Sequence, residues 1–209
     1  MKKILFYINA LNGGGAERVM SNLSSQFTDN GYEVIFVTSY PAEGEYELNK
    51  KIKRFNLEND NYEYSKLKRN YIRIKKLRQI CKREKPDVII AFMAEPNFRA
   101  IIATIGLRTK TIISVRNDPN KEYSGKLMSF VGKCILPLAD GCVFQTKDAK
   151  EWFPKKLQKK STIIYNAVKA DFFEIQRKPI DGLVVTCGRL EEQKNHKMLI
   201  RAFKNVVEK

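Results

Sequence analysis

The chain has 209 residues, 43% of them hydrophobic, which is enough to build a sizeable core and excludes a disordered chain. No apolar run reaches the roughly 18–20 residues that span a bilayer, and the short apolar start leads into glycines instead of a signal-peptide cleavage site. One histidine and four dispersed cysteines give no metal-ligand spacing, so we expect no metal site and buried free thiols, as in a reducing cytoplasm.

The net charge of +16 is distributed unevenly. Residues 1–60 carry seven Lys or Arg against eight Asp or Glu, whereas the other 149 residues carry 32 against 15. A one-sided positive field attracts phosphates, nucleic acid or anionic lipid headgroups, and the charge alone does not distinguish among them.

Apolar strand-like runs alternate with segments of helical period, which is typical of a parallel α/β sheet with helices on both faces. In chain order we predict strands at Ile4–Ile8, Glu33–Thr38, Val88–Phe92, Thr111–Val115, Gly141–Gln145 and Thr162–Tyr165, with a weak edge strand at Ile52–Leu57. We predict helices at Ala16–Asp29, Lys66–Glu84, Pro96–Ile105, Tyr123–Leu138 and Lys147–Phe153. The expected fold class is a Rossmann-like α/β sheet.

The last part of the chain predicts the start of a second domain. Residues 181–209 favour an apolar strand, a Gly-Arg turn and an amphipathic helix. A lone strand-helix unit cannot bury its own apolar face, so we expect the chain to be a portion of a two-domain protein. The expected boundaries are residues 1–166 for the first domain, 167–181 for a connector and 182–209 for the beginning of the second.

A glycine cluster follows the first strand and opens the first helix. At Gly13, Gly14 and Gly15 the backbone can approach a ligand closely, and the helix N-terminus attracts an anion. A tight turn with nothing bound explains such a cluster equally well. A dinucleotide fingerprint would place a third glycine where Arg18 stands and an acidic residue after the second strand, which ends at Tyr40. This disfavours NAD but leaves an NADP-linked oxidoreductase open.

A second cluster lies near the end of the chain, again between a predicted strand and a predicted helix. Arg189 and Lys194 follow Gly188 at the carboxyl end of that strand. The guanidinium fork and the ammonium group could clamp a diphosphate. Two solvated cations on a turn are the alternative interpretation.

Taken together, these clusters resemble the retaining glycosyltransferases of family 4, which have the GT-B architecture. The resemblance covers nearly the whole chain and is closest to enzymes that extend lipid-linked or capsular glycans. The matching segments are Gly13–Val19, Ser114–Pro119, Ala139–Gly141, Phe144–Thr146, Ile164–Val168, Gly188–Leu190 and Gln193–Asn195.

The resemblance implies that the first domain is the acceptor side and that the second domain binds the nucleotide-diphospho-sugar. It implies that Gly14 and Gly15 lie against the donor's phosphate or the transferred sugar. It also implies that Arg189 and Lys194 are the catalytic pair that neutralises the leaving diphosphate, which requires fixed cations and no metal or other cofactor. Asn166 lies in a matching segment and is expected to bind substrate.

The sequence departs from the family pattern at two places. Many members carry His-Asp where this chain has Arg116–Asn117, and we expect Arg116 to contact donor or acceptor instead. The family's E-x7-E element would lie beyond Lys209, so we expect this chain alone to be inactive. We expect His196 to cover the start of the last helix instead of acting as an acid or base.

Three basic segments suggest contact with a membrane surface. Lys66–Lys85 contains ten Lys or Arg and one Glu, with an apolar stripe from Leu67 and Tyr71 through Cys81. Lys147–Lys160 carries Trp152 and Phe153 among six lysines, and Lys126–Leu138 is apolar enough to touch lipid. An ordinary sheet-covering helix explains the apolar stripe but not the density of charge.

We therefore expect a retaining hexosyl- or N-acetylhexosaminyltransferase acting on a glycan or polyprenyl-diphosphate-linked acceptor. It would be cytoplasmic and peripheral at the inner face of the cell membrane, docked on anionic lipid and without a nucleic-acid partner. The alternatives are a basic nucleic-acid- or membrane-binding module and an NADP-linked Rossmann oxidoreductase, besides an inactive remnant of an enzyme. No helix-turn-helix, zinc-finger or RRM pattern supports a nucleic-acid module.

Overall fold

The computed structural model describes residues 2–58, 65–166, 180–188, 190 and 192–207, and the chain divides into two compact units, Met1–Asn166 and Ala167–Lys209. The strands of the first unit are β1 (Lys3–Ile8), β2 (Glu33–Thr38), β3 (Lys53–Asn56), β4 (Val88–Phe92), β5 (Lys110–Val115), β6 (Gly141–Phe144) and β7 (Ser161–Ile163). Its α-helices are α1 (Gly15–Asp29), α2 (Lys66–Glu84), α3 (Ala94–Thr104), α4 (Pro119–Glu122), α5 (Lys126–Phe130), α6 (Lys147–Glu151) and α7 (Lys155–Gln158).

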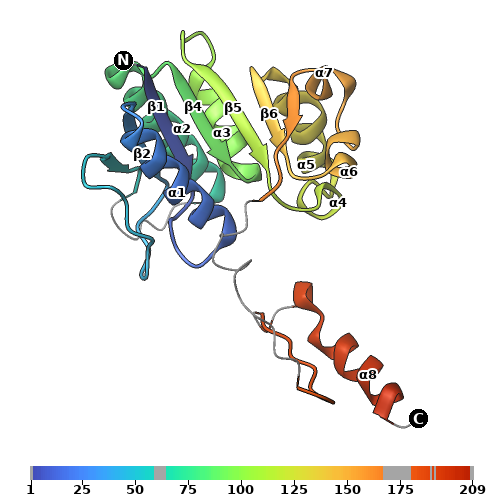
Figure 1. Ribbon diagram of the computed structural model, residues 1–209. Coiled ribbons are helices and arrows are strands. Elements are labelled where there is room, and N and C mark those ends of the chain that lie inside the picture. Colours follow the sequence, from blue (N-terminus) through green and yellow to red (C-terminus); the bar gives the residue numbers. More distant parts are fainter. Residues whose placement is uncertain (1, 59–64, 167–179, 189, 191, 208–209) are drawn as a thin grey trace. The chain divides into compact units, whose positions relative to one another are not determined.

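The seven strands form one sheet in the order β3-β2-β1-β4-β5-β6-β7, and every neighbouring pair is parallel (Figure 1). The predicted parallel α/β sheet is confirmed, including the short edge strand β3. The strand order reverses between β1 and β4, where the chain starts to build the sheet in the opposite direction. In open sheets of this kind ligands bind outside the carboxyl ends of the strands at such a switch point.

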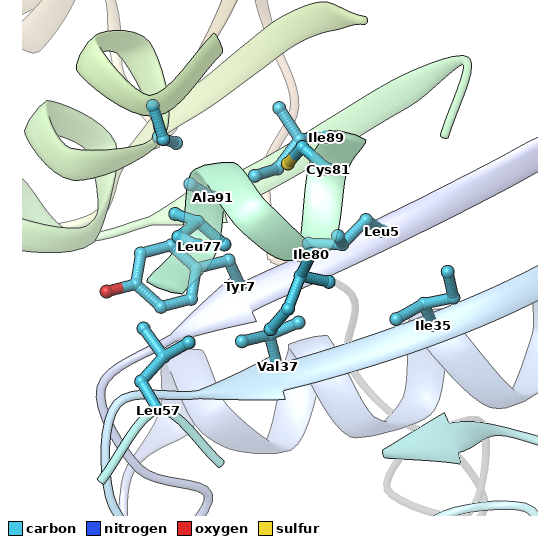
Figure 2. Packing of buried hydrophobic residues seen from close by; sticks show 12 residues of the cluster. Leu5, Tyr7, Ile35, Val37, Leu57, Leu77, Ile80, Cys81, Ile89 and Ala91 are labelled. Carbon is cyan, nitrogen blue, oxygen red and sulfur yellow. The ribbon is translucent and has the colours of Figure 1, made fainter. Parts of the chain in front are cut away.

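Both faces of the sheet are covered because successive side chains of each strand point to opposite sides. Leu5 and Tyr7 of β1 pack with Leu77 and Cys81 of α2 on one face, as Figure 2 shows. The alternate residues of β1, including Phe6, pack in a separate cluster with Met20 of α1 on the other face. The prediction of helices on both faces is therefore confirmed.

The single helix predicted at Tyr123–Leu138 is confirmed in part, because the chain is helical from Lys126 to Leu138 but is not one regular α-helix. The chain forms α4, breaks at Gly125 with φ of 81°, and continues through α5, the π-helical turn η1 (Val131–Ile135) and the 3-10 turn η2 (Leu136–Leu138). A φ of this sign favours glycine and ends a regular helix. Pro137 has no N–H to donate, which favours the tighter final turn.

The apolar stripe predicted along α2 is only partly correct. Leu77 and Cys81 are buried against the sheet, but Leu67 and Tyr71 have exposed fractions of 81% and 66%. The first half of α2 instead buries Arg73, whose guanidinium pairs with the Glu58 carboxylate at 2.9 Å. A buried ion pair therefore takes the place that the spacing assigned to apolar side chains.

Two of the four cysteines also differ from expectation. Cys81 and Cys142 are buried, whereas Cys134 and Cys187 are exposed. Cys134 lies on the outer side of η1, so its apolar neighbours in the sequence do not enclose it. Phe153, which was expected among membrane-facing residues, is instead buried in the core beside Phe144.

In the second unit the structure describes the turn η4 (Glu192–Lys194) and the helix α8 (His196–Val207). The predicted helix is thus confirmed, and His196 is its first residue. The predicted strand is not formed, because residues 183–188 have no hydrogen-bonded neighbour strand among the described residues of the chain. A strand needs such a partner to satisfy its backbone groups.

Candidate functional site

The predicted site residues of the first unit gather at one edge of the sheet. All strands are parallel, so the loops that follow β1, β4, β5 and β7 emerge at the same edge. These loops carry the glycine cluster, Arg116 and Asn166, as predicted from the sequence. Whether these residues bind substrate stays a prediction.

The glycines after β1 serve different purposes in the loop. Gly13 has φ of 67°, a conformation that glycine adopts without strain. Gly14 caps α1, and the Glu17 carboxylate lies where a side chain on Gly14 would begin. At Gly15, no atom lies within 4 Å of the position that a Cβ would occupy. The N-terminus of α1 is thus approachable at Gly15 and is shielded at Gly14 by a carboxylate that an anionic ligand would have to displace.

Arg116 connects three strand ends. Its guanidinium lies 4.6 Å from the centre of the Phe92 ring at the end of β4, and its Nη2 donates to Asn166 Oδ1 at 2.7 Å after β7. Partial burial lowers the pKa of the Arg116 guanidinium. Because the ordinary pKa of arginine is above 12, the group keeps its charge at neutral pH. The structure therefore brings Arg116 and Asn166 together at the carboxyl edge of the sheet.

The junction of β4 and α3 holds a strained residue that the sequence did not reveal. Met93 has φ of 77°, a conformation that is costly for a residue with a side chain. The following N–H, of Ala94, donates to Oε1 of Glu122 at 3.2 Å, and Asn117 Nδ2 donates to the same oxygen at 3.1 Å. Glu122 thus ties the loop after β4 to the loop after β5.

A buried arginine supports the loop after β1. Arg99 of α3 has an exposed fraction of 1%, and its Nη1 donates to Asn9 Oδ1 at 2.6 Å. Its Nε donates to Asn70 Oδ1 at 2.8 Å, and its Nη2 pairs with the Glu95 carboxylate at 2.5 Å. The sequence predicted only that Arg99 lies in a helix, at Pro96–Ile105. No periodicity signal distinguishes a buried arginine from an exposed one.

A pocket of about 460 Å³ opens between the loops after β5 and β6. It was missed by the sequence reasoning, which assigned Trp152 to a membrane-facing segment. The only signal in the sequence was the cluster of amide and carboxylate side chains after two neighbouring strands. The lining residues are Val115, Arg116, Asn117, Asp118, Pro119, Asn120, Gln145, Thr146, Asp148, Ala149 and Trp152.

In the second unit, Lys194 is exposed and ends the turn η4, two residues before α8 begins. A side chain added at Gly188 would lie 3.5 Å from both Lys194 Cγ and His196 Nε2. Gly188 therefore leaves room for these two side chains. Arg189, the other predicted catalytic cation, lies outside the residues that the structure describes. The roles of Arg189 and Lys194 stay predictions.

The described residues lack two features of other protein classes. Within the described ranges, no three His, Cys, Asp or Glu side chains are grouped so that they could hold a metal ion. Among the helices that the structure describes, none combines the length and the apolar character needed to cross a bilayer.

The fold matches that of several solved structures. The Anabaena protein HepE, solved with UDP and glucose, superposes with a TM-score of 0.63 at 15% identity, over 83% of this chain and 46% of that one. Sucrose-phosphate synthase from Thermosynechococcus elongatus gives a TM-score of 0.63 at 12% identity, over 79% and 48% of the two chains. The architecture is that of one Rossmann-like half of a GT-B protein.

The family model described as Glycosyltransferase Family 4 matches residues 13–172. The chain therefore belongs to glycosyltransferase family 4, as the resemblance predicted. This family is distinct from the dinucleotide-dependent oxidoreductases that the glycine cluster had left open.

Curated relatives in the same family are similar over most of this chain. The GalNAc-α-(1→4)-GalNAc-α-(1→3)-diNAcBac-PP-undecaprenol α-1,4-N-acetyl-D-galactosaminyltransferase of Campylobacter jejuni is 28% identical over 97% of this chain and 57% of its own length. An uncharacterised glycosyltransferase of Methanocaldococcus jannaschii is 29% identical over 87% of this chain and 51% of its own. The chain thus spans about half the length of the curated relatives it matches.

Proposed function

We propose that this chain provides the acceptor-side domain of a retaining glycosyltransferase. The enzyme would move a hexose or N-acetylhexosamine residue from a nucleotide-diphospho-sugar to a glycan carried on a polyprenyl diphosphate. The observation that carries the proposal is the meeting of Arg116 and Asn166 at the carboxyl edge of the parallel sheet. Two residues 50 positions apart, both predicted to bind substrate, are joined there by a hydrogen bond.

The chemistry fits a transfer that needs no metal. Breaking the bond between sugar and diphosphate builds negative charge on the leaving group, which fixed cations stabilise. Lys194 is exposed in its turn and is proposed as one such cation, with Arg189 as the other. The names of the Campylobacter relatives, which are N-acetylgalactosaminyltransferases of undecaprenyl-diphosphate-linked glycans, support the same acceptor class.

We also propose that the enzyme acts while docked on the cytoplasmic leaflet. Helix α3 packs between α2 and the η1–η2 segment, so these elements form one layer on the sheet. Leu67 and Tyr71 of α2 are exposed at one side of this layer, and Leu127, Phe130 and Leu138 at the other. Exposed lysines accompany both groups. Apolar side chains among cations are the combination that binds anionic lipid.

The test is transfer of radiolabelled N-acetylhexosamine from its UDP derivative to undecaprenyl-diphosphate-linked glycan. The 209-residue chain is assayed alone and after fusion to the remaining C-terminal length of the Campylobacter relative. We expect labelled product with retained anomeric configuration from the fusion, and Lys194→Ala should lower its turnover on the order of 10²-fold.

The exposed Lys197→Ala variant, one turn further on, is the matched control and should retain turnover. A fusion that binds random RNA tightly and salt-dependently in a filter assay, and transfers no sugar, would replace the proposal with a nucleic-acid-binding function.

A further inference from the structure

The pocket between the loops after β5 and β6 has the chemistry of a carbohydrate site. Its rim carries the amide side chains of Asn117, Asn120 and Gln145. Both polar atoms of the Asn120 amide are bonded within the rim, to Trp152 and Asp118, whereas the Gln145 amide can donate and accept hydrogen bonds with sugar hydroxyls. Trp152 adds a large flat apolar surface to the wall. Its volume of about 460 Å³ falls within the range of small-ligand sites, roughly 300–1,000 Å³.

The walls of this pocket are held in place by contacts within the lining and with residues behind it. The indole N–H of Trp152 donates to Asn120 Oδ1 at 3.0 Å, which fixes both side chains. The Trp152 ring packs against Tyr123 and Phe153 with centroid distances of 5.7 and 4.8 Å. On the opposite wall, Glu122 accepts a hydrogen bond from Asn117 Nδ2. A site with fixed walls loses little entropy when a ligand binds.

The charge of the lining selects against a phosphate. Although the chain carries a net charge of +16, the lining residues comprise one cation, Arg116, and two carboxylates, Asp118 and Asp148. The Asp118 carboxylate is engaged by the backbone N–H of Asn120 at 3.0 Å, while Asp148 is exposed in the first turn of α6. A diphosphate would meet net negative charge here, whereas hydroxyl groups can donate to both carboxylates.

The position of the pocket relates it to the acceptor. It lies two strand spacings, about 10 Å, along the carboxyl edge from the switch point between β1 and β4. Arg116 belongs both to the pocket lining and to the predicted substrate-binding pair. If the reacting end of a glycan lies at the switch point and the glycan extends along this edge, a sugar remote from the reacting end would therefore lie in the pocket.

We infer that this pocket binds a non-reacting sugar residue of the acceptor glycan and so selects acceptors by glycan structure. The inference rests on the proposed glycosyltransferase function. Acceptor specificity is determined in the pocket by Asp148, Asn120 and Trp152. The diphosphate of the carrier lipid binds outside the pocket.

Trp152 is the only tryptophan of the chain, so its fluorescence reports directly on the pocket. The 209-residue chain is titrated with the soluble disaccharide GalNAc-α-(1→4)-GalNAc and, separately, with inorganic pyrophosphate, and binding is checked by saturation-transfer NMR. We expect a saturable fluorescence change and NMR transfer with the disaccharide alone. Asp148→Ala should weaken disaccharide binding about tenfold, the loss expected for a hydrogen bond to a charged acceptor.

Glu151→Ala is the matched control, because Glu151 is the other carboxylate at the exposed side of α6 and does not line the pocket. It should leave disaccharide binding unchanged, and circular dichroism verifies that both variants are folded. No response to the disaccharide, a response to pyrophosphate instead, or equal effects of the two variants would overturn the inference.

The proposed function is judged separately by the transfer assay. Transfer to the lipid-linked glycan without binding of the free disaccharide refutes the pocket and leaves the function intact. Binding of the disaccharide without any transfer refutes the function and leaves a glycan-binding pocket.

Discussion

The guanidinium of Arg116 is held between the face of Phe92 and the side-chain oxygen of Asn166, at 4.6 Å and 2.7 Å respectively. These three residues follow or end different strands, so one side chain joins β4, β5 and the segment after β7. The family pattern has His-Asp at the position of Arg116–Asn117, and the larger cation occupies that place in this chain.

We predict that Arg116→Ala lowers kcat/KM for sugar transfer by the fusion enzyme on the order of 10²-fold, because a fixed positive charge is removed from the substrate edge. The matched control is Lys110→Ala, which removes a cation from the other end of β5, where Lys110 pairs with Asp140. Steady-state kinetics with the lipid-linked acceptor measure the effect. Equal kinetics for Arg116→Ala and the control would remove Arg116 from the proposed site.

We predict that Arg99→Leu lowers the free energy of unfolding by about 1–3 kcal/mol, the cost of leaving a buried acceptor without its donor. The substitution removes the Arg99 donor from Asn70 Oδ1 and one of the two donors to Asn9 Oδ1, which keeps the Ser39 hydroxyl. Urea denaturation measures the change. Because the Glu95 side chain is 59% exposed, Glu95→Gln should cost less than about 1 kcal/mol. A similar decrease in the free energy of unfolding for Arg99→Leu and Glu95→Gln would contradict this prediction.

Two glutamates should affect stability with opposite dependence on pH. Hydrogen bonds from Lys53 and Arg83 hold the pKa of Glu84 below its ordinary value. A depressed folded-state pKa stabilises the protein above the ordinary value of about 4.3, and this stabilisation is lost as the pH falls through the folded-state pKa. Glu84→Gln should therefore be less stable than the wild type at pH 7, with a difference that shrinks below pH 4.

Burial instead raises the pKa of Glu122, whose Oε2 finds no hydrogen-bond partner among the residues that the structure describes. A raised folded-state pKa makes the wild type lose stability as the pH rises from about 4 toward that pKa. Relative to the wild type, Glu122→Gln should therefore gain stability between pH 4 and pH 7. Urea denaturation at a series of pH values measures the free energy of unfolding of both variants relative to the wild type. If this difference changed with pH in the same direction for Glu84→Gln and Glu122→Gln, the opposite pKa shifts would be contradicted.

The cysteines should separate into two reactive and two protected thiols. Burial raises the pKa of Cys81 to about 12 and also raises that of Cys142, whereas Cys134 and Cys187 are exposed. Because the thiolate is the reactive form, iodoacetamide at pH 8 should add two groups to the folded protein and four after denaturation. Peptide mass spectrometry locates the adducts. Rapid labelling of Cys81 in the folded protein would contradict its burial.

The membrane surface is tested by liposome co-sedimentation with anionic and with neutral vesicles. The double variant Leu127→Asp and Phe130→Asp should reduce binding to anionic vesicles more than tenfold, since two apolar contacts are lost and two negative charges added. Leu190→Asp, at a residue with an exposed fraction of 93% in the second unit, is the control. If the wild type bound neutral vesicles as well as anionic vesicles at physiological salt, electrostatic attraction to anionic lipid would be refuted.

The alternation of apolar runs and helical periods was sufficient to predict the sheet and most helix positions. It failed where the determinant is local backbone geometry, as at Gly125 and Pro137, or a long-range ion pair, as at Arg73 with Glu58. The strand predicted near the start of residues 181–209 is not formed for another reason, since pairing depends on a neighbouring strand and not on the apolar sequence itself. Contacts such as Arg116 with Asn166 join distant positions, and no local pattern encodes them.

The sequence predicted that the glycine cluster, Arg116 and Asn166 follow strands of the sheet, but it did not predict the pocket. A glycine cluster and cations that follow predicted strands can be recognised in a single amino-acid sequence. The pocket depends instead on two loops, 115–120 and 145–152, being brought side by side by the pairing of β5 with β6. Its key aromatic, Trp152, lies among lysines in the sequence and was therefore assigned to a lipid surface.

Strand β1 is the first element of the chain but lies in the interior of the sheet, with β2 on one side and β4 on the other. During synthesis it can pair with β2 early, but its second edge stays open until Val88–Phe92 has left the ribosome. Until then the nascent chain exposes an apolar strand edge of the kind that recruits other chains. While residues 39 to 92 are being translated, the apolar strand β1 therefore has a partner on one side only.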